Sequence, residues 1–125
     1  MNITESFLAE ASRFIKRQSL YMGKSKPAQL WSACIDNFVQ KPDNFNFYEN
    51  KDTKGCYLIH KTKRQFLVLT HDGHLITPGS PSKLRLVVDK AHRQETIKNI
   101  KQITGQEIAE KYPFFFSKDF AEECR

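Results

Sequence analysis

Cysteine is scarce in this chain of 125 residues, and no long apolar run interrupts it. The three cysteines, Cys34, Cys56 and Cys124, are an odd number and show no CxxC spacing. This pattern argues against both a disulfide scaffold and a four-ligand zinc site. Apolar runs such as 66–69 and 86–88 are far shorter than the roughly 18 residues that a membrane span needs. We therefore expect no disulfide framework and no membrane partner.

Glycine and proline are also sparse, at five residues each, and the chain has no internal repeat or low-complexity tract. Ten Phe, four Tyr and one Trp supply large side chains for a core, which argues against disorder. The first residues carry Glu5 and Glu10 within their apolar pattern and show no small-residue cleavage signal, so we expect no secretory leader. The length predicts a single domain, 1–125. We expect a soluble protein that acts in the cytoplasm, either of its own cell or of a target cell into which it is delivered.

Acidic residues are too few to balance the basic ones: 14 Asp and Glu face 20 Lys and Arg, and the net charge is +6. The excess lies in residues 51–101, which hold eleven basic and four acidic residues together with all four histidines. A local positive field of this kind favours a polyanionic partner, with RNA first and an acidic protein next.

Hydrophobic spacing predicts an α+β fold. Steps of three and four residues indicate helices over 3–22 and 25–40. Alternation from residue 55 onward then indicates a three-stranded antiparallel meander over 55–61, 65–70 and 74–77. The dipeptide Asp72-Gly73 between two apolar runs is typical of a hairpin turn.

The flanks of this meander are harder to assign. Residues 42–54 are predicted as a polar loop, although Phe45 and Phe47 alternate as in a short edge strand. Residues 84–88 are predicted as a further strand. The spacing of later isoleucines predicts a third helix over 90–104, and a short helix is expected over 106–112. The sequence therefore predicts N-terminal helices, a small antiparallel sheet and C-terminal helices. The run Phe114-Phe115-Phe116 must either pack in the core or remain an exposed surface for a protein partner.

The meander holds the densest group of polar residues. RNA cleavage without a metal needs a base for the 2′-hydroxyl, an acid for the leaving oxygen and cations for the phosphorane. Histidines that titrate near neutral pH, with cations beside them, can fill these roles. The candidate catalytic residues are His60, Lys61, Arg64, His71 and His74. The candidate nucleic-acid-binding residues are Lys51, Lys54, Lys63, Lys83, Arg85, Lys90 and Arg93.

Metal and cofactor motifs are missing from this group. Neither HxH nor HExxH spacing occurs, and Gly73 and Gly79 are scattered turn glycines rather than a phosphate-binding loop. We expect no metal and no cofactor.

The stretch 28–79 resembles the colicin D-type nuclease domains of the barnase, EndoU, colicin and RelE-like ribonuclease toxins. The similar parts are a helix over 30–38, a polar loop over 51–55, a hydrophobic strand with a glycine turn over 66–73, and a short strand over 75–77. The resemblance implies a toxin-like ribonuclease acting on structured RNA such as transfer RNA, countered by an immunity or inhibitor protein. The Lys-His segment that precedes the helix in that family has no histidine here, since 21–26 offers only Lys24 and Lys26. Catalysis would then depend on the histidines of the meander.

Three function classes follow from these observations. The first is a metal-independent ribonuclease, with a general acid and base. The second is a non-catalytic nucleic-acid-binding or regulatory module, favoured by the missing histidine before the helix. The third is a secreted effector or inhibitor that binds an acidic protein, favoured if 114–116 is exposed.

Overall fold

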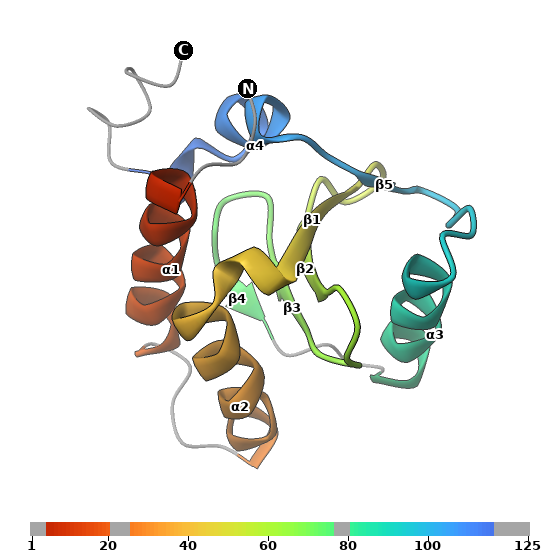
Figure 1. The fold of residues 1–125 in the computed structure, drawn as a ribbon, viewed down its shortest axis with the longest axis horizontal. Helices are drawn as coiled ribbons and strands as arrows, with labels where there is room; N and C mark the ends of the chain where they lie inside the picture. The colour runs from red at the N-terminus through yellow and green to blue at the C-terminus, as the bar shows by residue number, and fades with distance from the viewer. Residues whose placement is uncertain (1–4, 21–25, 77–80, 117–125) are drawn as a thin grey trace.

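The computed structural model describes residues 5–20, 26–76 and 81–116, with the side chains of 26–31 and 81 left aside. The chain begins with two helices, α1 (Glu5–Ser19) and α2 (Lys26–Gln40), followed by a short 3-10 turn, η1 (Pro42–Asn44). Both helices lie where the three- and four-residue spacing predicts them. Figure 1 shows the two helices together on one side of a sheet.

The described strands form one antiparallel sheet, in the order β4-β3-β2-β1-β5. Its members are β1 (Phe45–Asn50), β2 (Cys56–His60), β3 (Phe66–Leu69), β4 (Leu75–Ile76) and β5 (Ile100–Gln102). The predicted α+β class and the meander of β2, β3 and β4 are confirmed. At the second turn, the amide of Gly73 donates to the carbonyl of Thr70 (3.0 Å), and Gly73 adopts a φ of +93°. Only glycine adopts that conformation without strain, which explains the turn at this position.

The first strand is longer and more central than its sequence indicates. β1 lies between β2 and β5, so it is an internal strand of the sheet and not an edge strand. Phe45 and Phe47 point to the face covered by α1 and α2, where they contact the ring of Phe38 edge-on. The main core lies on this face, between the sheet and the two N-terminal helices.

A third helix, α3 (Pro81–His92), covers the opposite face of the sheet. It packs Leu84, Val87, Val88 and Ala91 against a second, smaller core that includes Tyr48, Ile59, Phe66 and Val68. The prediction of a strand over 84–88 is therefore wrong. The buried positions follow helical steps of three and four, whereas Leu86, which lies between them, is 62% exposed.

The predicted helix over 90–104 is also wrong. α3 ends at His92, and the chain then takes positive φ angles at Gln94 (58°) and Asn99 (64°), which a continuous helix does not allow. The following residues form β5, which pairs with β1 through Tyr48↔Gln102 and Asn50↔Ile100. Pairing with a strand distant in sequence overrides the local helical spacing of Ile97, Ile100 and Ile103.

The last described elements close the main core. A capping box between Thr104 and Glu107 starts α4 (Gly105–Lys111), which confirms the short helix to within a residue of its predicted bounds. A second 3-10 turn, η2 (Pro113–Phe115), carries the aromatic run inward, so that Phe115 and Phe116 are buried. The rings of Phe116 and Phe7 lie 4.0 Å apart between centroids. Phe115 and Phe116 are therefore core residues, and Phe114 packs against the same core while partly exposed.

Within the described part of the chain, none of the helices has the length and apolar character needed to cross a membrane.

Candidate nucleic-acid interface

The histidines of the meander lie at two opposite ends of the sheet. His60 is the last residue of β2, whereas His71 and His74 belong to the turn that joins β3 to β4. Because Cys56 pairs with Leu69 and Ile59 with Phe66, the turn that carries His71 lies beyond the start of β2. Four residues of strand separate Cys56 from His60, which corresponds to about 13 Å. The structure therefore does not bring His60 together with His71 or His74 around one phosphate.

His60 has a structural environment. Its side chain is buried, with 7% of the residue exposed, and its ring contacts Phe45 edge-on. The Nδ1 atom accepts hydrogen bonds from the backbone amides of Thr62 and Lys63, both at 3.0 Å. Burial lowers the pKa of His60, and the positive charges of Lys63 and His92 lower it further. This histidine is held neutral, with its Nδ1 already engaged.

His71 and His74 are exposed on their turn. The turn is organised by Asp72, whose carboxylate accepts from the hydroxyl of Thr70 and lies 3.4 Å from His74 Nε2. The hydrogen bond from Thr70 is the main reason that the pKa of Asp72 is lowered, and His74 contributes to it. The two histidines thus lie on one short turn and are accessible to a ligand.

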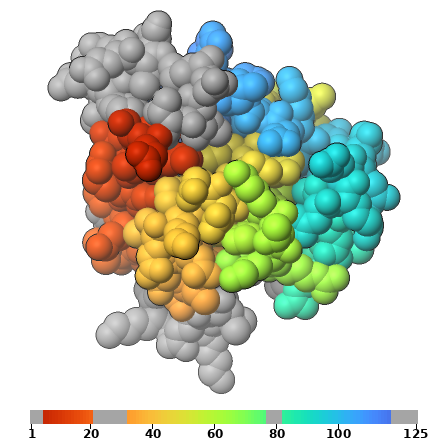
Figure 2. Space-filling model, viewed as in Figure 1, coloured from red at the N-terminus to blue at the C-terminus, as the bar shows by residue number. Residues whose placement is uncertain are grey.

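The other predicted catalytic residues, Lys61 and Arg64, lie in the segment between β2 and β3. Arg64 forms a bidentate pair with Asp89 of α3, with both N–O distances at 2.9 Å. From the same helix, His92 Nε2 donates to the carbonyl oxygen of His60 at 2.6 Å. Figure 2 shows the green surface of this segment directly beside the cyan surface of α3. Lys61 remains exposed.

A groove of about 740 Å³ runs along β1, between this strand, β5 and the segment 91–97. Its floor includes the amides of Asn46 and Gln102 and the ring of Tyr48. Lys61 reaches one end, since its amide bonds to Asn44 just before β1 begins, and Lys51 follows the other end of the strand. A strand of six residues spans about 20 Å, so the groove carries a lysine at each end of an elongated, polar floor. We call this the β1 groove.

The charge of the β1 groove is positive. Lys51, Lys61 and Lys101 line it together with one acid, Glu95, and that acid pairs with Arg93 at 2.6 Å. Lys101 lies 3.5 Å from Glu107. Among the ion pairs between described residues, none involves Lys51 or Lys61, so both lysines keep their charge for a ligand.

The predicted nucleic-acid-binding residues occupy several surfaces. Lys51 lines the β1 groove, and Lys63 is exposed beside the groove lysine Lys61. Arg93, beyond the end of α3, is paired with Glu95. The remaining four are exposed, with Lys54 in the turn between β1 and β2 and the other three on α3: Lys54, Lys83, Arg85 and Lys90.

The sequence reasoning missed part of the groove. Asn46, His92, Lys101 and Gln102 line it, but they were not among the predicted binding residues. A helix over 90–104 would have carried Lys101 and Gln102 away from β1. Asparagine adopts a positive φ more readily than most residues, as Asn99 does here. Asn99 is therefore the feature of the sequence that argues against a helix continuing to residue 104.

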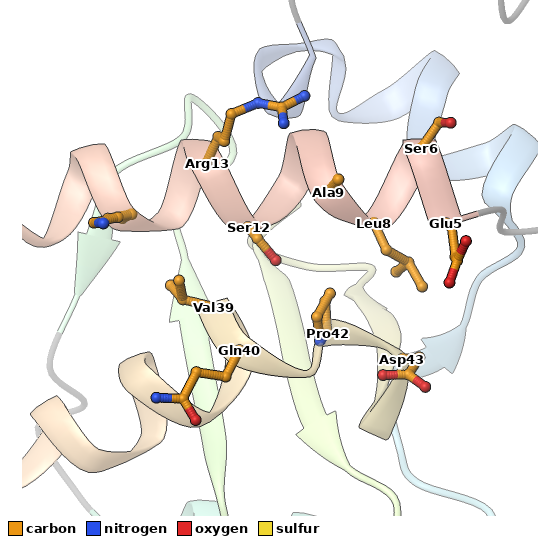
Figure 3. Close-up of a pocket in the computed structure, with 11 residues that line it drawn as sticks. Glu5, Ser6, Leu8, Ala9, Ser12, Arg13, Val39, Gln40, Pro42 and Asp43 are labelled. Atoms are coloured by element: carbon orange, nitrogen blue, oxygen red, sulfur yellow. The ribbon is translucent and has the colours of Figure 1, made fainter.

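A second groove, of about 720 Å³, lies between α1 and the segment that joins α2 to β1. Leu8, Val39 and Pro42 form its apolar part, and Glu5 and Asp43 lie toward one end (Figure 3). Arg13, although part of the lining, points away from α2 and lies 3.2 Å from Glu10. Its mixed charges do not select a polyanion.

No group of three metal-ligating side chains is present in the part of the chain that the structure describes. Comparison of the chain with family models, curated proteins and solved structures found no match.

Proposed function

We propose that the protein binds single-stranded RNA, or an unpaired RNA segment, in the β1 groove. The observation that carries the proposal is the pair of lysines, Lys51 and Lys61, that stand without carboxylate partners among the described residues at the two ends of the groove. A ligand with negative charges repeated along its length satisfies both lysines at once. A compact anion satisfies only one.

The floor of the groove suits bases better than it suits a duplex. The side-chain amides of Asn46 and Gln102 offer both donors and acceptors to the edges of unpaired bases. Tyr48 is buried, so its contribution is contact area and not stacking with bases. Positively charged grooves that follow a strand backbone are typical of single-strand binding.

The exposed lysine of the neighbouring segment, Lys63, extends the positive surface beyond the groove. Lys83, Arg85 and Lys90 add positive charge on the outer side of α3, with Asp89 the one acid of that helix. These residues contribute to long-range attraction, which accelerates association and is screened by salt.

Fluorescence anisotropy with a labelled single-stranded RNA of about twelve nucleotides tests the proposal. Lys51→Glu and Lys61→Glu should each weaken binding at least about fivefold, because each removes one phosphate contact and places a carboxylate in its stead. Lys16→Glu, on α1 and away from the β1 groove, changes the net charge equally and should have a much smaller effect. The slope of log affinity against log salt should approach −0.7 for each phosphate neutralised. Equal effects of all three variants, or binding that salt does not change, would refute the β1 groove as the site.

A ribonuclease remains a second proposal, supported by the exposure of His71 and His74 on one short turn. One would take the proton of the 2′-hydroxyl and the other would protonate the leaving 5′-oxygen, giving a 2′,3′-cyclic phosphate. His71→Gln should then lower cleavage by about 10² to 10⁴ without changing the melting temperature. Incubation with total RNA in excess EDTA tests this reaction, and 2′-O-methyl RNA should bind without being cut. A wild-type protein that leaves RNA intact would exclude the ribonuclease.

A further inference from the structure

The segment between β2 and β3, residues 61–65, is held by a histidine that itself lies outside the β1 groove. The amide of His60 donates to the carbonyl of Gln65 at 2.8 Å and closes the hairpin. The ring of the same residue then turns back over the loop, where its Nδ1 atom accepts from the amides of Thr62 and Lys63. One side-chain atom therefore satisfies two successive backbone donors.

The other fixed points of this loop lie on either side of those two amides. Lys61 is anchored through its own amide to the carbonyl of Asn44, at 2.8 Å. Arg64 is anchored to Asp89 of α3. The residues between them, Thr62 and Lys63, are exposed, and the amides of both donate to Nδ1 of His60.

We infer that His60 is a positioning residue for the RNA-binding lysines and that protonation of its ring releases them. This inference rests on the function proposed above. A proton on Nδ1 converts the shared acceptor into a donor that faces two other donors, so the ring and the loop can no longer keep their arrangement. Lys63 belongs to the released segment and Lys61 directly precedes it, so the ordering of these two lysines before RNA binds is then lost.

The surroundings of the ring oppose a positive charge. Lys63 faces it from the loop and His92 faces it from α3, while β1 presents the apolar ring of Phe45. Burial and these two groups lower the pKa of His60 below its usual range. The loop is consequently ordered at neutral pH and is released only as the pH falls into the acidic range.

The direction of this effect separates it from ordinary electrostatics. Protonation of an exposed histidine adds positive charge, so a simple basic surface that carries histidines binds RNA more tightly as the pH falls. Release of the loop instead lowers the affinity for RNA as the pH falls. We expect the affinity for a single-stranded RNA to fall about three- to tenfold between pH 7 and pH 5, at constant salt.

Two substitutions isolate the ring nitrogen. His60→Asn places an amide oxygen near the position of Nδ1, so it keeps an acceptor that does not titrate. His60→Phe keeps the ring against Phe45 and removes the acceptor. We expect His60→Asn to bind RNA at pH 7 as the wild type does and to lose the acid-dependent decrease. We expect His60→Phe to be weakened three- to tenfold already at pH 7.

Nuclear magnetic resonance of the free, ¹⁵N-labelled protein supplies a readout that does not depend on RNA. In the wild type the amide signals of Thr62 and Lys63 should shift together in one acid transition, which His60→Asn abolishes and the control His71→Asn leaves unchanged. If His60→Phe does not fold, the comparison of wild type with His60→Asn still decides. Amides that do not shift, or that shift alike in His60→Asn, would overturn the inference. A shared transition in a protein that binds no RNA at pH 7 would instead refute the proposed function alone.

Discussion

Glu49 of β1 is a buried carboxylate that forms an ion pair with Lys111 of α4. Only 5% of the residue is exposed. Its Oε2 atom lies 2.6 Å from Nζ of Lys111, which belongs to α4 and is 45% exposed at its side chain. The hydrogen bond with Glu49 is the main reason that the pKa of Lys111 is raised. The pair joins the last helix to the middle of the sheet.

Replacing Lys111 with Met keeps the length of the side chain and removes the charge. Breaking a fully buried ion pair by deleting one partner costs about 3–5 kcal/mol, whereas an exposed pair contributes about 0–1 kcal/mol. Here the carboxylate is buried and the ammonium is half-exposed, so we expect Lys111→Met to lower the free energy of unfolding by about 1.5–3 kcal/mol at pH 7.

Urea denaturation followed by circular dichroism measures this change. Lys101→Met is the matched control, since Lys101 pairs with Glu107 in an exposed setting, and it should cost less than about 0.5 kcal/mol. The double variant Glu49→Gln with Lys111→Met should be more stable than Lys111→Met alone, because the amide leaves no buried charge. A cost below about 0.5 kcal/mol for Lys111→Met, or a double variant that is less stable than the single one, would refute this reasoning.

Two further predictions concern the core. Gly73→Ala should cost about 2–4 kcal/mol in urea denaturation, because φ is +93° and the new Cβ would lie 2.8 Å from Cγ of Phe114. A tolerated alanine would show that the turn moves freely away from the aromatic core. Cys34 and Cys56 are buried, and burial raises the pKa of both thiols, so a thiol reagent at pH 8 should modify neither until urea is added. Peptide mapping by mass spectrometry checks this, and rapid labelling of native Cys56 would contradict it.

The local sequence is sufficient for the parts of the fold whose partners are near in the chain. Alternation over 55–77 and the Asp72-Gly73 turn predict a meander, and each of its strands pairs with the next along the chain. The first two helices are similarly predicted by spacing that matches their buried faces. In these regions, local propensity and tertiary packing favour the same structure.

The sequence-based predictions are wrong where the conformation of a segment depends on contacts with residues distant in the chain. Residues 84–88 alternate well enough for a strand, but the face that meets the second core selects Leu84, Val87 and Val88, which only a helix places together. Ile97, Ile100 and Ile103 have helical spacing, yet Ile103 donates its amide to Phe47, in a strand more than fifty residues earlier. Nothing in the local spacing indicates that partner.

The candidate site also combines features that the local sequence predicts with features that depend on distant strand pairing. The sequence predicts Lys51 as a nucleic-acid-binding residue and Lys61 as a catalytic residue, but it does not indicate that β1 places them at the two ends of one groove. The other wall of that groove depends on β5, so it exists only because the chain leaves the helix at His92 and pairs with β1 after Asn99. Strand pairing also explains why His60 lies far from His71 and His74. An antiparallel meander places successive turns at opposite ends of its strands, so the β2–β3 segment and the β3–β4 turn cannot share one ligand-binding centre. The composition indicates a polyanionic partner. The strand pairing determines which lysine and arginine side chains of the protein can contact that partner at the same time.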